Sequence, residues 1–122
     1  MRTLLIDLDG VLNTYTGNFN PDFIPPVKEG AKEFLTNLVD NNYEIKIFTT
    51  RDKSLAQKWL EENQLSQFVT AVTNTKDPAF LIIDDRCLTF NGDYQNTLAE
   101  IRKFLPWFKK PNFINTNTGG TA

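Results

Sequence analysis

Short apolar segments that stop abruptly at charged or hydroxyl side chains constrain the fold of this chain more than any other feature of its sequence. Four such segments are present, at residues 3–8, 43–48, 67–72 and 80–83. Segments with the apolar spacing of helices separate or follow them, at residues 26–40, 52–60 and 98–105. Short apolar strands that alternate with helices are typical of a parallel sheet covered on both faces. We therefore predict an α/β, three-layer Rossmann-like fold with a central parallel sheet.

The length of 122 residues favours one domain, because two separate hydrophobic cores would not fit comfortably. We expect this domain to cover residues 1–114. Residues 115–122 contain only Asn, Thr, Gly and Ala, with no large apolar side chain to anchor them. This composition predicts a flexible tail.

The chain contains no histidine and a single cysteine, Cys87. A Ser-His-Asp triad, a histidine-ligated zinc site, an internal disulfide and a thiolate metal cage are therefore excluded. The lone cysteine fits a reducing compartment, and we expect it to be a small buried side chain. No apolar run approaches the roughly 20 residues of a transmembrane helix, so we expect a cytoplasmic protein that makes no membrane contact. The net charge of −2 provides no overall basic field for nucleic acid.

The residues that follow the predicted strands carry most of the chemistry in the sequence. They are Asp7 and Asp9 after the first strand, Thr49, Thr50 and Arg51 after the second, and Asp84 and Asp85 after the last, with Lys76 shortly before it. Because the carboxyl ends of parallel strands meet at one edge of the sheet, these side chains are expected to share a crevice.

Four carboxylates in one crevice need a bound cation. Two of them about 4 Å apart repel by about 4 kcal/mol at an effective dielectric near 20. Mg²⁺, a hard ion that prefers carboxylate and water oxygens, is the best suited occupant. A single aspartate after a strand is usually a turn former or helix cap, but the whole set is better explained by function.

The order of these segments resembles the haloacid dehalogenase (HAD) superfamily of phosphotransferases. The sequence Asp-Leu-Asp-Gly-Val at 7–11 resembles the first motif of the family, and Thr49 after an apolar strand resembles the second. Lys76 fits the third motif, and Leu-Ile-Ile-Asp-Asp at 81–85 fits the fourth. The four motifs occur in the family's order over residues 5–86.

The resemblance implies a Mg²⁺-dependent phosphatase that acts through an aspartyl-phosphate. Asp7 would be the nucleophile, and Asp9 the general acid and base. Thr49 and Lys76 would hold the phosphoryl oxygens. The implied metal ligands are Asp7, Asp9 through its main-chain carbonyl, Asp84, and Asp85 directly or through a water.

Several of these residues have a second interpretation. Thr50 and Arg51 are candidates for substrate binding, but Arg51 could instead orient Asp84 or Asp85. Asn13, just after the first motif, could contact substrate or cap a turn. Thr49 could be an ordinary β-branched strand residue, with Thr50 as its replacement in the site. Lys76 could be a solvated surface lysine.

HAD enzymes usually carry a cap domain after the first motif or between the second and third. Here residues 13–26 form only a loop, and one helix with one short strand fills the second gap, so we expect no cap domain. In the family, an open site accompanies large substrates, such as nucleic-acid ends or phosphoproteins, or a lid supplied by a partner. By this analogy, the expected substrates are phosphorylated nucleotides or nucleic-acid ends.

Two other functions stay open at this stage. A phospho-accepting receiver domain of a signalling pathway has a similar length and also uses Asp, Thr and Lys around Mg²⁺. It needs its phosphorylated aspartate at the end of a middle strand, where residues 69–75 offer none. A catalytically silent HAD-like binding protein is the second alternative, although Asp7 and Asp9 are both intact.

Overall fold

The computed structural model describes residues 1–111, which group into two compact units. The first unit is Met1–Asp84, and the second begins at Asp85. The predicted tail at 115–122 lies outside the described residues, as do residues 112–114 of the predicted domain.

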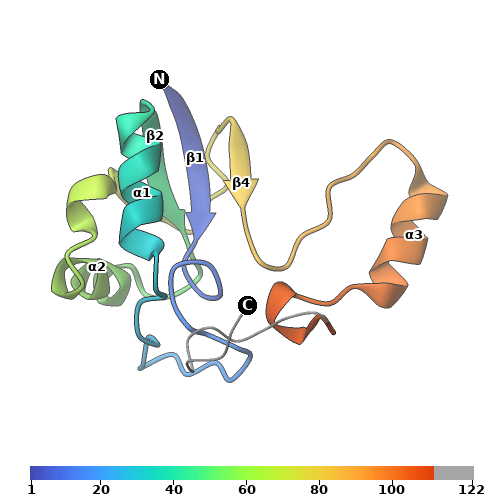
Figure 1. Ribbon diagram of the computed structural model, residues 1–122, viewed down its shortest axis with the longest axis horizontal. Helices are drawn as coiled ribbons and strands as arrows, with labels where there is room; N and C mark the ends of the chain where they lie inside the picture. The colour runs from blue at the N-terminus through green and yellow to red at the C-terminus, as the bar shows by residue number, and fades with distance from the viewer. Residues whose placement is uncertain (112–122) are drawn as a thin grey trace. The chain divides into compact units, whose positions relative to one another are not determined.

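The first unit is an α/β fold built on a four-stranded parallel sheet (Figure 1). Its strands are β1 (Arg2–Asp7), β2 (Tyr43–Phe48), β3 (Ala71–Thr73) and β4 (Leu81–Ile83), in the spatial order β3-β2-β1-β4. Helix α1 (Ala31–Asp40) connects β1 to β2, and α2 (Lys53–Glu62) connects β2 to β3. The predicted Rossmann-like class with a parallel sheet flanked by helices is confirmed.

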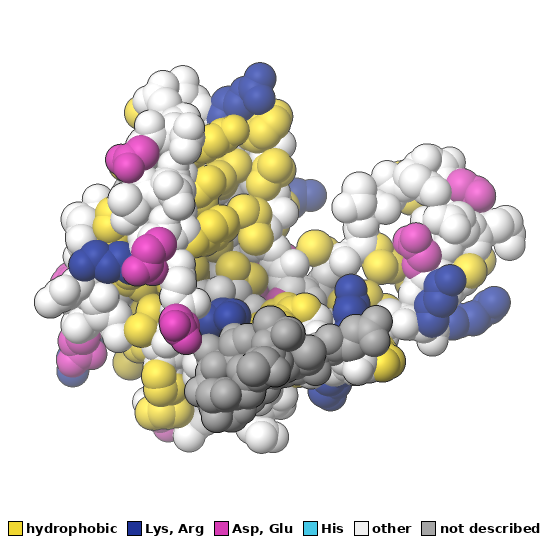
Figure 2. Space-filling view, in the orientation of Figure 1, with side chains coloured by type: hydrophobic (Ala, Val, Ile, Leu, Met, Phe, Trp, Pro, Cys, Tyr) yellow, Lys and Arg dark blue, Asp and Glu magenta, His cyan; other side chains and the backbone are white. Residues whose placement is uncertain are grey.

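One hydrophobic core lies between the two helices and one face of the sheet. Alternate residues of the two central strands supply its floor, and the helices cover it with residues that include Leu35 and Trp59. The floor residues are Leu4, Ile6, Ile45 and Ile47. Beside α1, apolar side chains of the strands stay visible at the surface (Figure 2), and Leu81 of β4 is 42% exposed.

The opposite face of the sheet carries both polar and apolar side chains, and Leu5 is fully buried there beside Lys46 and Ile82. The Thr3 hydroxyl donates a hydrogen bond of 2.7 Å to Glu44, which holds the pKa of the Glu44 carboxyl below its ordinary value. Lys46 forms an ion pair of 3.5 Å with Asp77, in the segment that connects β3 to β4. This ion pair holds the β3–β4 segment against the face of the sheet opposite to α1 and α2.

Two helix starts test the sequence reasoning. The expected start of the first helix near residue 26 is too early, because Val27 forms an antiparallel bridge with Asn13, and α1 begins after Gly30 at a φ of 90°. The expected cap of the second helix is confirmed, since the Asp52 carboxylate accepts a hydrogen bond of 3.0 Å from the Leu55 N–H.

The third strand is shorter than expected, because residues 66–68 form the 3-10 helix η1.

Residues 1–84 form a single compact unit, so neither the 13–26 loop nor the chain between β2 and β4 is a separate domain. The expectation that no cap domain interrupts the motifs is confirmed for this part of the chain. Among the described helices, none has the length and apolar character needed to cross a membrane.

The second unit contains helix α3 (Tyr94–Lys103), whose first turn is capped by Asp93 through a hydrogen bond of 3.0 Å from the Gln95 N–H. The helix ends before Pro106, close to where the sequence predicts it. None of its residues is buried, and Ile101 is 57% exposed. Cys87 is also exposed, so the expectation that it is buried is wrong.

Candidate functional site

The strand order reverses between β1 and β4, and open α/β sheets bind ligands at the carboxyl ends of the strands at such a point. The pairing of β1 with β4 runs from Leu4 opposite Leu81 to Ile6 opposite Ile83. The next residues along the two strands are Asp7 and Asp84. The two aspartates therefore lie side by side at the end where both arrowheads point in Figure 1.

Asp7, Asp84 and Asp85 form a carboxylate cluster in which one oxygen from each residue lies within 4.8 Å of the other two. Two unit charges about 4.8 Å apart repel by roughly 3.5 kcal/mol at an effective dielectric of 20. Three hard oxygen donors at this spacing are suited to a divalent cation such as Mg²⁺. The cluster can therefore hold a metal ion.

The fourth aspartate, Asp9, directs its carboxylate to a different partner. Arg51 donates to both of its oxygens, from Nε to Oδ2 at 2.8 Å and from Nη2 to Oδ1 at 3.1 Å. The Arg51 side chain is only 1% exposed and that of Asp9 15%. Of the four carboxylates expected to converge, three lie together. The fourth, that of Asp9, binds the buried Arg51 instead.

Arg51 also joins the end of β2 to the loop at 13–26. Its Nη1 donates a hydrogen bond of 2.9 Å to the Asn20 carbonyl, and the Phe19 ring lies 4.5 Å from the guanidinium carbon. All three guanidinium nitrogens therefore donate within the protein. The sequence left two roles open for Arg51, but neither included Asp9 as its partner.

Asn13 is fully buried and supports the same carboxylate. Its Nδ2 donates a hydrogen bond of 3.0 Å to Asp9 Oδ1, while its Oδ1 accepts from the N–H groups of Gly10 and Tyr15. Gly10 adopts a φ of 83°, which only glycine reaches without strain, and the chain turns sharply there. These contacts favour the turn-capping interpretation of Asn13.

The other predicted residues differ in how they are placed. Thr49 is buried at the end of β2, and its hydroxyl oxygen accepts a hydrogen bond of 3.1 Å from the Arg51 N–H. Thr50 is exposed beside it. Lys76 is exposed in the segment between β3 and β4. Their predicted roles in phosphoryl or substrate binding stay predictions.

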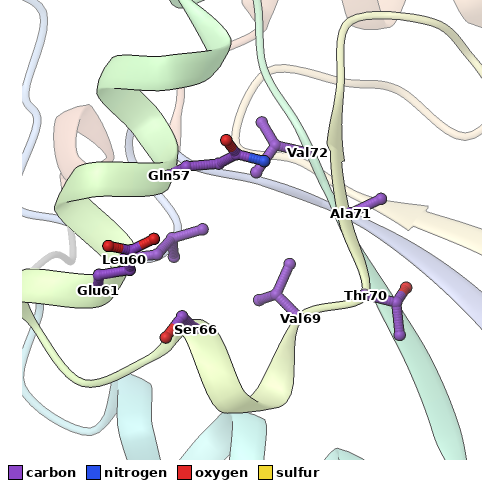
Figure 3. A pocket seen from close by; sticks show the side chains of 8 residues that line it. All are labelled: Gln57, Leu60, Glu61, Ser66, Val69, Thr70, Ala71 and Val72. Carbon is purple, nitrogen blue, oxygen red and sulfur yellow. The ribbon is translucent and has the colours of Figure 1, made fainter.

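Two pockets of the first unit lie at opposite ends of the sheet. One, of about 220 Å³, lies between α2, η1 and the start of β3 (Figure 3). Its lining includes Leu60, Val69 and Ala71, and its position at the amino end of β3 separates it from the aspartates. The other, of about 380 Å³, lies at the carboxyl ends of β2 and β3 and includes Thr49 and Thr50.

Comparison with known proteins identifies a similar fold and no family. The fold is similar to the structure of a conserved protein from Bacteroides thetaiotaomicron, with a TM-score of 0.58 and 20% sequence identity. The match covers 84% of this chain and 90% of the Bacteroides chain. No protein-family model matches the chain, and no curated protein matches it. At this identity the likeness shows the fold alone.

We predict that replacing Arg51 by Met lowers the free energy of unfolding by about 3 kcal/mol, because Asp9 then keeps a largely buried charge without its cation. Arg102→Met, which removes an exposed arginine of α3, serves as the control and should change stability by less than about 0.5 kcal/mol. Urea unfolding measures both. Equal stability of Arg51→Met and the wild type would show that the pair does not support the fold.

We predict that millimolar Mg²⁺ raises the melting temperature by about 5 °C, because the ion binds the native carboxylate cluster. Asp84→Asn removes one charge at nearly constant shape, so it should melt no lower than the wild type in EDTA and should lose most of the Mg²⁺ gain. Asp40→Asn, at the exposed end of α1, should keep the gain. If Asp84→Asn were less stable in EDTA and kept the full gain, Asp84 would be a structural residue.

Proposed function

We propose that the protein is a HAD-like phosphatase that hydrolyses phosphomonoesters through an aspartyl-phosphate on Asp7. The observation that carries this proposal is the cluster of Asp7, Asp84 and Asp85 at the point where the strand order reverses. The arrangement of the sequence motifs supports it, because three of the four lie at or just beyond strand ends and Lys76 lies in the segment before β4. The residues of the cluster would hold Mg²⁺, which would neutralise charge on the phosphoryl group when bound.

The chemistry proceeds in two displacements at phosphorus. An oxygen of Asp7 attacks phosphorus, and the bond from phosphorus to the leaving oxygen breaks as Asp9 gives that oxygen a proton. A water then attacks the phosphorus of the aspartyl-phosphate and gives its proton back to Asp9. The bond to Asp7 breaks, which releases phosphate and restores both carboxyl groups.

The contacts of Asp9 differ in strength between the two forms that it takes in this cycle. In the resting arrangement its two oxygens accept hydrogen bonds from Arg51 and Asn13. A protonated carboxyl oxygen accepts hydrogen bonds more weakly than a carboxylate oxygen does, so these contacts are stronger in the carboxylate form than in the acid form. The contacts to Arg51 suit the base step, in which Asp9 acts as a carboxylate.

Thr49 and Lys76 are the proposed holders of the phosphoryl oxygens. Thr49 lies one residue beyond Phe48, which pairs with Asp7 across β1 and β2. The Thr49 hydroxyl keeps its proton for donation, because in its hydrogen bond with the Arg51 N–H the hydroxyl oxygen is the acceptor. Lys76 would bring its ammonium group from the β3–β4 segment to neutralise charge as the phosphoryl group transfers.

The proposed substrates are phosphorylated nucleotides or nucleic-acid ends. Within residues 1–84 no separate domain is inserted between the motifs, and by analogy such a site suits a substrate larger than the reacting phosphate. The 13–26 loop reaches the site through Asn13, which donates a hydrogen bond to Asp9, and through Asn20 and Phe19, which contact Arg51.

A receiver domain is less well supported by the sheet. Receiver domains have the strand order 2-1-3-4-5, in which β1 lies between β2 and β3. Here β1 lies between β2 and β4, and β3 is at the edge. Repeated turnover with prompt phosphate release supports the phosphatase, whereas long retention of one phosphoryl group would support the receiver.

We predict that Asp7→Asn lowers phosphate release at least about 1,000-fold, because an amide is a poor nucleophile at phosphorus. The measurement is Mg²⁺-dependent release of phosphate from a panel of nucleotides, phosphorylated oligonucleotide ends and sugar phosphates. Asp40→Asn controls for the loss of a carboxylate elsewhere. Near-normal turnover by Asp7→Asn, with reversion to Asp excluded by mass spectrometry, would rule out this role.

A further inference from the structure

The pocket at the carboxyl ends of β2 and β3 borders the proposed reaction site. Thr49 lines it and is the residue proposed to hold a phosphoryl oxygen. Because the pocket spans the ends of β2 and β3, a group bound in it would lie roughly 5–10 Å from Asp7 in the direction across the sheet. The pocket volume of about 380 Å³ lies within the range of roughly 300–1,000 Å³ found for small-molecule sites.

The lining of this pocket is polar and carries groups of both charges. Val72 is its apolar floor residue, and Arg51 forms part of the wall. The polar lining consists of Thr49, Thr50, Asp52, Lys53, Thr73 and Asn74. Its charges balance, because Asp52 and Lys53 oppose each other and Arg51 is paired with Asp9.

A lining with no net charge is poorly suited to bind a phosphate group in addition to the one at the reaction site. Each guanidinium nitrogen of Arg51 already donates within the protein, which leaves Lys53 as the one cation of the lining outside an ion pair among the described residues. The carboxylate of Asp52, whose Oδ2 caps α2, would repel an added anion. A neutral ligand with many hydrogen-bonding groups fits the lining better.

We propose that this pocket binds the hydroxyl-rich, non-reacting part of a phosphomonoester, the sugar of a free sugar phosphate or of a nucleotide. Each sugar hydroxyl both donates and accepts a hydrogen bond. Thr73 and Asn74 offer the matching donors and acceptors, and Asp52 offers an acceptor. This proposal rests on the proposed phosphatase function and assigns the substrate specificity of the same site.

The test compares two esters that differ in their hydroxyl groups. Ribose 5-phosphate carries them and phenyl phosphate does not. The double variant Thr73→Val/Asn74→Leu removes two polar groups from the pocket, neither of them assigned to phosphoryl binding, and Asn37→Leu, at an exposed amide of α1, is the control. We expect the variant to raise KM for ribose 5-phosphate about tenfold, the loss of two hydrogen bonds, and to leave kcat/KM for phenyl phosphate within about twofold.

A second measurement separates binding from turnover. Calorimetric titration of the Asp7→Asn enzyme with ribose 5-phosphate, with and without the pocket changes, should show the same tenfold loss of affinity. Adenosine 5′-monophosphate, tested in parallel, distinguishes the two sources of the sugar. If it binds no better than ribose 5-phosphate, the sugar phosphate alone fills the pocket, and if it binds better, the nucleotide is the preferred source.

The two proposals can fail separately. Equal effects of the pocket variant on both esters, or no effect on either, would overturn the sugar site while turnover by the wild type upholds the phosphatase. If the wild type hydrolyses neither ester nor any other on the panel, the phosphatase fails. The calorimetric loss of ribose 5-phosphate affinity would then still support the pocket as a sugar-phosphate site.

Discussion

The parallel pairing of β1 with β4 is the constraint on which the candidate site depends. This pairing sets Ile6 opposite Ile83, so the residues that follow, Asp7 and Asp84, lie next to each other at the end of the two strands. Apolar pairing along the strands stabilises the arrangement, and the carboxylates at its end oppose it by mutual repulsion. This repulsion is a local cost that a cation bound at the cluster would lower, and such costs are common at functional sites.

A second interaction separates the aspartates by their contacts. Asp7 and Asp9 are two residues apart, yet Asp7 joins the carboxylate cluster while Asp9 is held by Arg51 and Asn13. The separation fits a division between a residue that attacks phosphorus and one that moves a proton. Because Arg51 also contacts Phe19 and Asn20, the position of Asp9 depends on the 13–26 loop.

The sequence predicts those parts of the structure that follow from local patterns. Apolar runs and their polar ends locate the strands, and Asp52 locates the start of α2, because each depends on a few neighbouring residues. The start of α1 was not predictable in this way, since Val27 has helical spacing but pairs with Asn13. The Asp9–Arg51 pair was missed because it joins residues 42 positions apart through a tertiary contact.

The most direct test of the account is to find where the phosphoryl group resides during turnover. The enzyme is quenched in acid while it hydrolyses a phosphomonoester with Mg²⁺, reduced with borohydride, digested and analysed by mass spectrometry. An aspartyl-phosphate on Asp7 predicts homoserine at position 7, which should be absent when substrate is omitted. Steady turnover with an unmodified Asp7, or a phosphoryl group on another residue, would contradict the central claim.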